Sequence, residues 1–292
     1  MTSTPDIIAG TPEKPRRATF DLIALLAAPG LLFLALIYAL PLALLLFQSL
    51  RGADGSLGIA NYVAFFSEPF NIGVLMRTLR VAALTTLLAL LIAYPTAIAM
   101  NRAKGVWLTV FLVAMVLPMS LGVVVKAFAW SILFRANGAL NQMMQAIGLT
   151  DAPVRMLFTE TALVIGAANV FLPFMVLPIY AVLQQQQASL ADAAASLGAG
   201  PFFRFFHVAL PLTLPGIVAG GAFVFSLSVS MYVIPSLIVG ETQQNLPMLI
   251  ARSFLYLRNE QLGSTISAIL LIIAISVVLG SSWLARRLGA RE

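Results

Sequence analysis

Long uncharged runs alternate with short polar stretches along almost the whole chain. A helix that crosses a membrane needs about 20 largely apolar residues, and six segments meet this condition: 22–47, 81–100, 106 to about 134, 161–183, a segment that starts near 212 within 208–240, and 262–285. Spanning strands would be about 9–11 residues long and would alternate between apolar and polar positions. These runs are longer and lack that alternation. The pattern therefore predicts an all-α, polytopic membrane protein with six transmembrane helices.

Composition agrees with this prediction and narrows the function. Of the 292 residues, 60% are hydrophobic and 10% are charged, whereas soluble domains have about 45–50% apolar and about 25% charged residues. A net charge of +6 would indicate nucleic acid in a soluble protein, but here the basic residues lie mostly at segment ends and in loops. The chain has no cysteine and one histidine, which excludes disulfides, thiolate sites and a multi-histidine metal site within it.

The charge near the two ends of the chain sets the expected topology. Basic residues cluster before the first span and after the last one: Lys14, Arg16, Arg17, Arg286, Arg287 and Arg291. Such clusters mark the cytoplasmic side, and an even number of spans places both termini on one side. We therefore expect cytoplasmic termini, with a polar tail over residues 1–20 and a transmembrane domain over residues 21–292.

The connection between the fourth and fifth apolar segments has the features of an ordered element. It includes "ADAAASLGAGPFFRFFHVALP", residues 191–211. Ser189, followed three residues later by Asp192, fits a capping box at a helix N-terminus. Gly198 fits the left-handed position that closes a helix. The sequence thus predicts a short helix that ends in a glycine elbow.

A second short helix is predicted directly after the elbow. Pro201 suits the first helical turn, where its missing N–H costs little. Four phenylalanines, Arg204 and His207 would follow on this helix, and Pro211 and Pro215 are expected to break the chain before the fifth span. The two helices would lie at the cytoplasmic face and present a partly aromatic surface for docking.

This stretch resembles the signature loop of the membrane subunits of binding-protein-dependent ABC importers. The pattern in that family is Glu-Ala-Ala, three residues, Gly, nine residues, Ile, one residue, Leu-Pro. The same spacing is present here as Asp192-Ala193-Ala194, Gly198, Val208 and Leu210-Pro211. Aspartate replaces glutamate and valine replaces isoleucine, so the chemical character of both positions is kept.

Further stretches resemble the spermidine/putrescine-type permeases of that family, so that the resemblance covers most of the chain. They are "ANYVAFFSEPFNIGVLMRTLRVAALTT", "AYPTAIAM", "VVVKAFAWSILFRANGALN" and "LPFMVLPIYAVL". An arginine often precedes the "AW" element in that subfamily, and Lys126 has this position here.

The resemblance implies a permease subunit of an ATP-driven importer with the type I (MetI-like) fold, located in a bacterial inner membrane. In the family, the loop that corresponds to residues 192–211 is a coupling helix that inserts into a groove on a cytoplasmic ATPase. On this basis the ATPase-coupling residues are Asp192, Ala193, Ala194, Gly198, Pro201, Arg204, Leu210 and Pro211. The alternative is that these residues only link two spans.

The resemblance also implies the partners and the cargo. A second, similar permease in a heterodimer, two ABC ATPase subunits that bind ATP and Mg²⁺, and a periplasmic substrate-binding protein would complete the importer. The expected substrate is a polyamine such as spermidine or putrescine, or a similar small solute. The chain itself has no G-x-x-x-x-G-K-[ST] phosphate loop, so we expect neither catalysis nor a cofactor in it.

Three residues are candidates for the translocation path. Lys126 interrupts an apolar run, and a charge at the centre of a spanning helix costs at least about 2.5–3.5 kcal/mol. It either lines the path, or it snorkels to the outer interface or forms a structural pair. Asn169, ahead of Pro173 and Pro178, marks a kinked path helix or an interhelical hydrogen bond. Tyr232, within "MYVIP", faces the path or packs ordinarily.

The longer outer loops offer surfaces for an external partner. In "NGALNQMMQAIG", Leu140, Met143, Met144 and Ile147 have the spacing of one apolar helix face. This helix either lies on the bundle or in the membrane interface, or it docks a partner. Three acids are expected in outer loops, where they contact a binding protein, attract cations or are simply solvated: Glu160, Glu241 and Glu260.

The alternative class is a stand-alone, ion-coupled secondary transporter. Such carriers often hold carboxylates within their spans for ion coupling. The six apolar cores contain no Asp or Glu, which argues against this class.

Overall fold

The computed structural model describes residues 18–52, 55–185, 196 and 198–289, and the chain divides into two compact units between Phe47 and Gln48. The first unit contains α1 (Ala18–Leu34), the π-helical turn η1 (Ala35–Ala39) and most of α2 (Leu40–Leu50). From Leu26 on, this segment is apolar and long enough to cross a membrane. It corresponds to the first predicted span.

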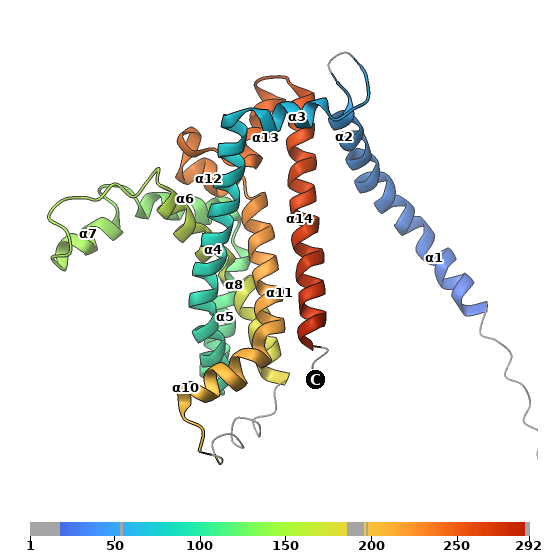
Figure 1. The fold of residues 1–292 in the computed structure, drawn as a ribbon. Coiled ribbons are helices and arrows are strands. Elements are labelled where there is room, and N and C mark those ends of the chain that lie inside the picture. Colours follow the sequence, from blue (N-terminus) through green and yellow to red (C-terminus); the bar gives the residue numbers. More distant parts are fainter. Residues whose placement is uncertain (1–17, 53–54, 186–195, 197, 290–292) are drawn as a thin grey trace, which may run out of the picture. The chain divides into compact units, whose positions relative to one another are not determined.

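Helices also make up the second unit (Figure 1). In chain order they are α3 (Ala60–Ser67), α4 (Pro69–Arg102), α5 (Val106–Ser120), α6 (Val123–Leu133), α7 (Ala139–Ala146), α8 (Glu160–Gln185), α10 (Pro201–Arg204), the π-helical turn η2 (Phe205–Ala209), α11 (Leu210–Ser230), α12 (Val233–Ile238), the 3₁₀ turn η3 (Gly240–Gln243), α13 (Leu246–Leu255) and α14 (Glu260–Gly289). Within the described ranges, the one strand-like pairing is an isolated bridge between Arg51 and Leu57. The all-α prediction is confirmed.

Helix α8 forms the centre of the second unit. It packs against α4 and α11, and α14 packs against α11 (Figure 1). Met175, Val176 and Ile179 of α8 are fully buried. The core of this unit is therefore built around the fourth predicted span. Within the described residues of both units, five helical segments are long and apolar enough to cross a membrane, or up to six if α5 and α6 together count as one span.

Small residues let α11 approach α8 closely. A Cβ atom added at Gly216 would lie 2.9 Å from the carbonyl oxygen of Pro178 and 3.0 Å from the Cα of Ile179. Without water between them, membrane helices associate mainly through such tight packing. Glycine at position 216 is therefore required by the short distance between the two backbones.

The third predicted span is wrong as a continuous helix. α5 and α6 are bent by 101° relative to one another. Pro118 lies in the last turn of α5, and Leu121 and Gly122 then adopt extended backbone with ψ of 134° and 141°. The helix therefore ends at Ser120, and Lys126 falls on a separate helix that points away from the axis of α5.

The fifth predicted span also needs correction, at both ends. Pro211 and Pro215 do not break the chain, since residues Pro201–Ser230 form one continuous helix of 30 residues. In η2 the N–H of Leu210 bonds to the carbonyl of Phe205, five residues back. This wide turn directly before Pro211 accommodates its ring and its missing donor. The helix instead ends at Ser230, where Met231 is extended with φ of −68° and ψ of 130°.

Candidate coupling segment and translocation path

The candidate coupling segment, called the coupling segment below, spans residues 189–211, and apart from Ser196 its described part begins at the elbow. Gly198 has a φ of +81°, the left-handed conformation that the sequence predicts there. Pro201 is the first residue of α10, also as predicted. Asp192, Ala193 and Ala194, together with the capping box that starts at residue 189, lie outside the described residues.

The phenylalanines of this segment divide into one anchor and an exposed group. Phe205 packs edge-on against Tyr94 of α4, with ring centroids 5.6 Å apart. Phe202 is 81% exposed, and Phe203 and Phe206 are exposed as well. The ring of His207 stacks on Phe203 at 4.1 Å. The segment is thus attached to α4 on one side and presents an aromatic surface on the other.

In the sequence, Arg204 lies between the exposed Phe203 and the anchored Phe205. It ends α10 and is half-buried. Its Nε atom is buried, without a hydrogen-bond partner in the part of the chain that the structure describes. Leu210 and Pro211, the last residues of the motif, begin α11. The motif therefore continues directly into α11, the fifth predicted span, with no break between them.

Lys126 lies beside a cavity at the bend between α5 and α6. The cavity has a volume of about 380 Å³. Its lining comes from both arms of the bend and from α8 and α11: Met119, Ser120, Leu121, Gly122, Val123, Lys126, Val170, Phe171, Phe174 and Leu227. Among these described residues, Lys126 carries the one charged side chain, so it sets the electrostatic character of the cavity.

Asn169 makes an interhelical hydrogen bond. Its Oδ1 accepts from the Nε1 of Trp130, one helical turn after Lys126, at 3.1 Å. Gly166, one turn earlier on α8, lets Trp130 and Ile238 approach, since an added Cβ would lie 2.8 Å from Ile238 Cδ1. Helices α6, α8 and α12 meet at this point. The bond matches the packing role that the sequence allows for Asn169.

Tyr232 lies at the break between α11 and α12, and 46% of it is exposed. The break is held by Asn245, whose Nδ2 donates to the carbonyl of Met231 at 2.7 Å. Within the described chain, no hydrogen bond or ion pair joins Lys126, Asn169 and Tyr232 to one another. The structure thus brings their helices together but leaves the three side chains separate.

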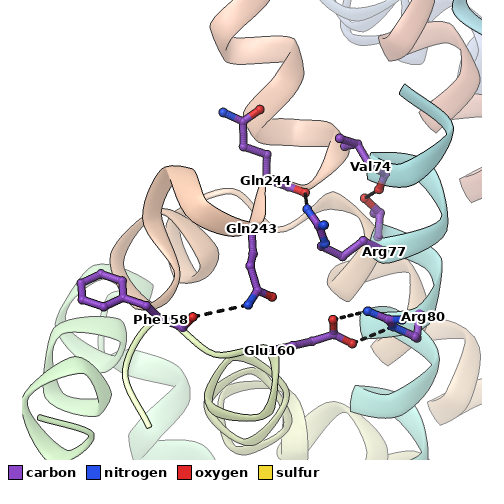
Figure 2. A network of polar contacts seen from close by, with 8 residues as sticks. Val74, Arg77, Arg80, Phe158, Glu160, Gln243 and Gln244 are labelled. Atoms are coloured by element: carbon purple, nitrogen blue, oxygen red, sulfur yellow. Dashed lines mark hydrogen bonds and ion pairs between the residues drawn. The ribbon is translucent and has the colours of Figure 1, made fainter. Parts of the chain in front are cut away.

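A polar network that joins α4 to the start of α8 and to the connection before α13 was not predicted (Figure 2). Arg80 of α4 forms a two-pronged ion pair with Glu160, the first residue of α8, and its Nε donates at 2.8 Å. The Nη1 of Arg77 donates to the carbonyl of Gln244 at 3.3 Å. The residues of this network lie on α4, at the start of α8 and in the connection that precedes α13.

The three acids expected in loops lie instead in the first turns of helical segments. Glu160 begins α8, Glu241 lies in η3 and Glu260 begins α14. Glu241 accepts from Gln244 Nε2 at 2.5 Å, and Glu260 accepts from Gln48 Nε2 at 3.5 Å. For Glu160 and Glu260, the signal available in the sequence was an acid just before an apolar run, since the N-terminus of a helix favours negative charge.

The predicted amphipathic helix is present as α7, but only half of its apolar face is covered. Leu140 and Met144 are half-buried, whereas Met143 and Ile147 are exposed, Ile147 to 75%. Figure 1 shows α7 away from the central helices of this unit. The helix therefore does not lie flat on the bundle.

Comparison with known proteins identifies the family. No protein-family model matches the chain. The spermidine/putrescine transport system permease protein PotB of Haemophilus influenzae is 34% identical over 243 residues, which cover 81% of this chain and 84% of that protein. The chain belongs to the permease subunits of ABC importers. This membership excludes the alternative class, a stand-alone secondary transporter.

Other relatives of this permease agree in sequence and in fold. The inner membrane ABC transporter permease protein YdcU of Escherichia coli is 34% identical over 74% of this permease and 75% of its own length. A bacterial alginate ABC transporter, solved with an alginate-bound periplasmic protein, has a TM-score of 0.73 at 17% identity and covers 93% of this permease and 96% of that chain. The MetNI methionine ABC transporter has a TM-score of 0.55 at 15% identity, and the match covers 73% of this permease and 93% of that chain. The permease therefore has the MetI-like fold.

Proposed function

We propose that this permease forms half of the translocation path of an ATP-driven importer for small polyamines such as spermidine and putrescine. The observation that carries the proposal is the 34% identity to the Haemophilus influenzae spermidine/putrescine permease over 81% of the chain. A second permease subunit forms the other half of the path. A periplasmic binding protein delivers the substrate, and two ATPase subunits, which bind ATP and Mg²⁺, hydrolyse the ATP.

The coupling segment is the contact with the ATPase. The exposed phenylalanines on α10 and η2 support this role, because an aromatic surface gains free energy when a partner groove covers it. Gly198 and Pro201 give the segment its shape, and Arg204 adds a half-buried positive charge at the end of α10. Asp192, Ala193 and Ala194 complete the contact surface, and Leu210 and Pro211 connect it to the fifth helix.

The proposed orientation follows from the coupling segment. If α10 contacts a cytoplasmic ATPase, then both termini, including the tail over residues 1–20, lie in the cytoplasm. The charge clusters near the termini support the same orientation. The Arg80–Glu160 network and α7 then face the periplasm, where the binding protein docks. The six-span domain over residues 21–292 lies in the bacterial inner membrane.

The proposed mechanism is alternating access. ATP-driven closure of the ATPase pair moves α10, and the continuous helix Pro201–Ser230 carries that motion across the membrane. We assign Lys126, Asn169 and Tyr232 to the path because they lie on or directly beside α6, α8 and α12, which meet near Gly166. An ATPase can drive this change only because it contacts α10 differently in its open and closed states.

Reconstitution tests the proposal. The permease is purified together with the proteins that it retains from native membranes, reconstituted in liposomes, and supplied with ATP and radiolabelled spermidine or putrescine. We expect an ATPase and a second permease to copurify, and uptake to require ATP and the binding protein. Transport by the lone permease without an ATPase would refute the mechanism. ATP hydrolysis by the complex without polyamine uptake would refute only the substrate.

A further inference from the structure

An uninterrupted helical stretch joins the coupling segment to the opposite end of the bundle, and α10 lies at an angle to α11 (Figure 1). Residues Pro201–Ser230 form one uninterrupted helical stretch of 30 residues, and the 21 residues of α11 alone rise about 32 Å at about 1.5 Å per residue. Because α10, η2 and α11 are continuous, a displacement of α10 is transmitted to the C-terminal end of α11 at Ser230. At that end the chain breaks at Met231 and continues into α12 beside Tyr232.

Asn245 closes this break with a buried side chain that makes two hydrogen bonds. The residue is 4% exposed. Its Nδ2 donates to the carbonyl of Met231 at 2.7 Å, and its Oδ1 accepts from the N–H of Met248 at 3.1 Å, which caps α13. Carbonyl groups at the end of a helix have no partner within the helix. Asn245 therefore satisfies the end of α11 and the start of α13 at once.

The residues on both sides of Asn245 are bonded to α4. The N–H of Leu246 donates to Thr78 Oγ1 at 2.9 Å, and Thr78 in turn donates to the carbonyl of Val74 at 2.8 Å. Arg77 donates to the carbonyl of Gln244 at 3.3 Å (Figure 2). The backbone on both sides of Asn245 is thus hydrogen-bonded to α4, and the side chain of Asn245 is hydrogen-bonded to the end of α11.

The long helix is consequently connected to α4 at both of its ends. At the α10 end Phe205 packs against Tyr94. At the opposite end the connection runs from the Met231 carbonyl through Asn245 to Thr78 and Arg77. The first contact is an aromatic packing contact that can slide, whereas the second is a chain of buried, directional hydrogen bonds.

We propose that Asn245 is a positioning residue that ties the end of α11 to α4, so that movement of α10 is delivered to the break at residues 231–232. The inference rests on the proposed function, because it assigns the route by which an ATPase acts on the far end of the permease. Without these hydrogen bonds, α10 and α11 would still move, but residues 231 and 232 would no longer move together with them.

Two substitutions separate this role from helix capping. Serine caps helices as well as asparagine does, but it is too short to reach the Met231 carbonyl, so Asn245→Ser keeps the cap and removes the tie. The matched control is Asn259→Ser. Asn259 caps α14 by accepting from the N–H of Leu262 at 2.9 Å, on an exposed turn.

The primary measurement is the amount of solute imported per ATP hydrolysed by the reconstituted importer. For Asn245→Ser we expect assembly with the ATPase and a ratio about 2- to 10-fold lower, the range that corresponds to one net hydrogen bond. We expect the ratio for Asn259→Ser to equal that of the unsubstituted complex. An unchanged ratio for Asn245→Ser would overturn the inference, whereas loss of only the yield of complex would indicate a merely structural role and would equally overturn it.

Hydrogen exchange on the unsubstituted complex gives a test that needs no variant and no solute. Exchange is compared between the nucleotide-free complex and the complex trapped with ATP and vanadate. The inference predicts that amides of residues 231–238 and 246–248 change together with those of α10. A change in α10 without a change in either of those segments would contradict it. Failure of any ATPase to associate would instead contradict the proposed function.

Discussion

At the scale of single residues, Asn141 holds the 135–154 loop together through one fully buried side chain. Its Nδ2 donates to the carbonyls of Arg135 and Val154 at 3.0 and 3.1 Å, and its Oδ1 accepts from the N–H of Val154 at 2.8 Å. Asn141→Leu would leave these groups unpaired, at a cost of about 1–3 kcal/mol for each one that stays buried. We expect tryptic cleavage at Arg155 to be at least about tenfold faster, which corresponds to about 1.4 kcal/mol.

The control for Asn141 is its neighbour. Gln142 is exposed and donates to the carbonyl of Asn137 at 3.0 Å. Gln142→Leu should therefore leave the cleavage rate nearly unchanged. Equal rates for the two variants would mean that Asn141 does not stabilise the loop.

Gly198 and Gly200 separate backbone conformation from steric space. Among the described residues, no atom lies within 4 Å of a Cβ added at either glycine, but Gly198 has a φ of +81° whereas Gly200 has a φ of −65°. Gly198→Val should cost about 1–3 kcal/mol of strain at the elbow and reduce ATP-driven uptake, while leaving membrane insertion intact. Gly200→Val should have little effect on uptake. If both variants transport equally well, the left-handed elbow does not matter for coupling.

At the scale of helices, the sequence predicted where apolar helices lie better than where they are interrupted. Pro118 and Pro211 are both prolines in apolar segments, yet the helix ends near Pro118 and continues through Pro211. A π-helical turn precedes Pro211 and shifts the hydrogen-bond register by one residue, whereas α8 continues through Pro173 and Pro178 without such a turn. The same turn precedes Pro41, where the N–H of Leu40 bonds to the carbonyl of Ala35. A local pattern of residue types does not encode this register.

Packing between helices gives a prediction at the same scale. Gly216→Ala would place a Cβ 2.9 Å from the carbonyl of Pro178, whereas the nearest atom to a Cβ at Gly221 is Thr86 Cγ2 at 3.9 Å. Backbone atoms of α8 cannot move aside as a flexible side chain can, and overpacking costs about 1–3 kcal/mol. We expect Gly216→Ala to lower the midpoint of thermal unfolding in detergent.

Gly221→Ala serves as the matched control on the same helix. It should leave that midpoint unchanged or raise it slightly, because alanine is about 0.5–1 kcal/mol better than glycine within a helix. A larger loss for Gly221→Ala than for Gly216→Ala would show that the close approach of α8 and α11 does not limit stability.

At the scale of the whole molecule, the elbow and the helix start within the coupling segment could be predicted, and the polar network could not. The spacing of the glycine and the prolines predicted the elbow at Gly198 and the helix that starts at Pro201, because both depend on neighbouring residues only. Arg80 and Glu160 are 80 residues apart in sequence, and Thr78 and Leu246 are 168 apart. Pairs of this kind depend on how α4, α8 and the α13 connection pack, which no local pattern specifies.

The division of the phenylalanines yields the prediction that decides whether α10 is a docking surface. Phe202 is 81% exposed, so Phe202→Ala should leave the thermal stability of the isolated permease unchanged. If an ATPase groove covers this side chain, its loss should weaken binding of the ATPase by about 10- to 100-fold, since burying a phenylalanine contributes about 1.5–3 kcal/mol. Phe205→Ala should show the opposite pattern, because Phe205 already packs against Tyr94 and its loss lowers the stability of the permease itself. Binding measured against the purified ATPase, together with thermal unfolding of both variants, checks the pair. Unchanged ATPase affinity for Phe202→Ala would place the docking surface elsewhere on the permease.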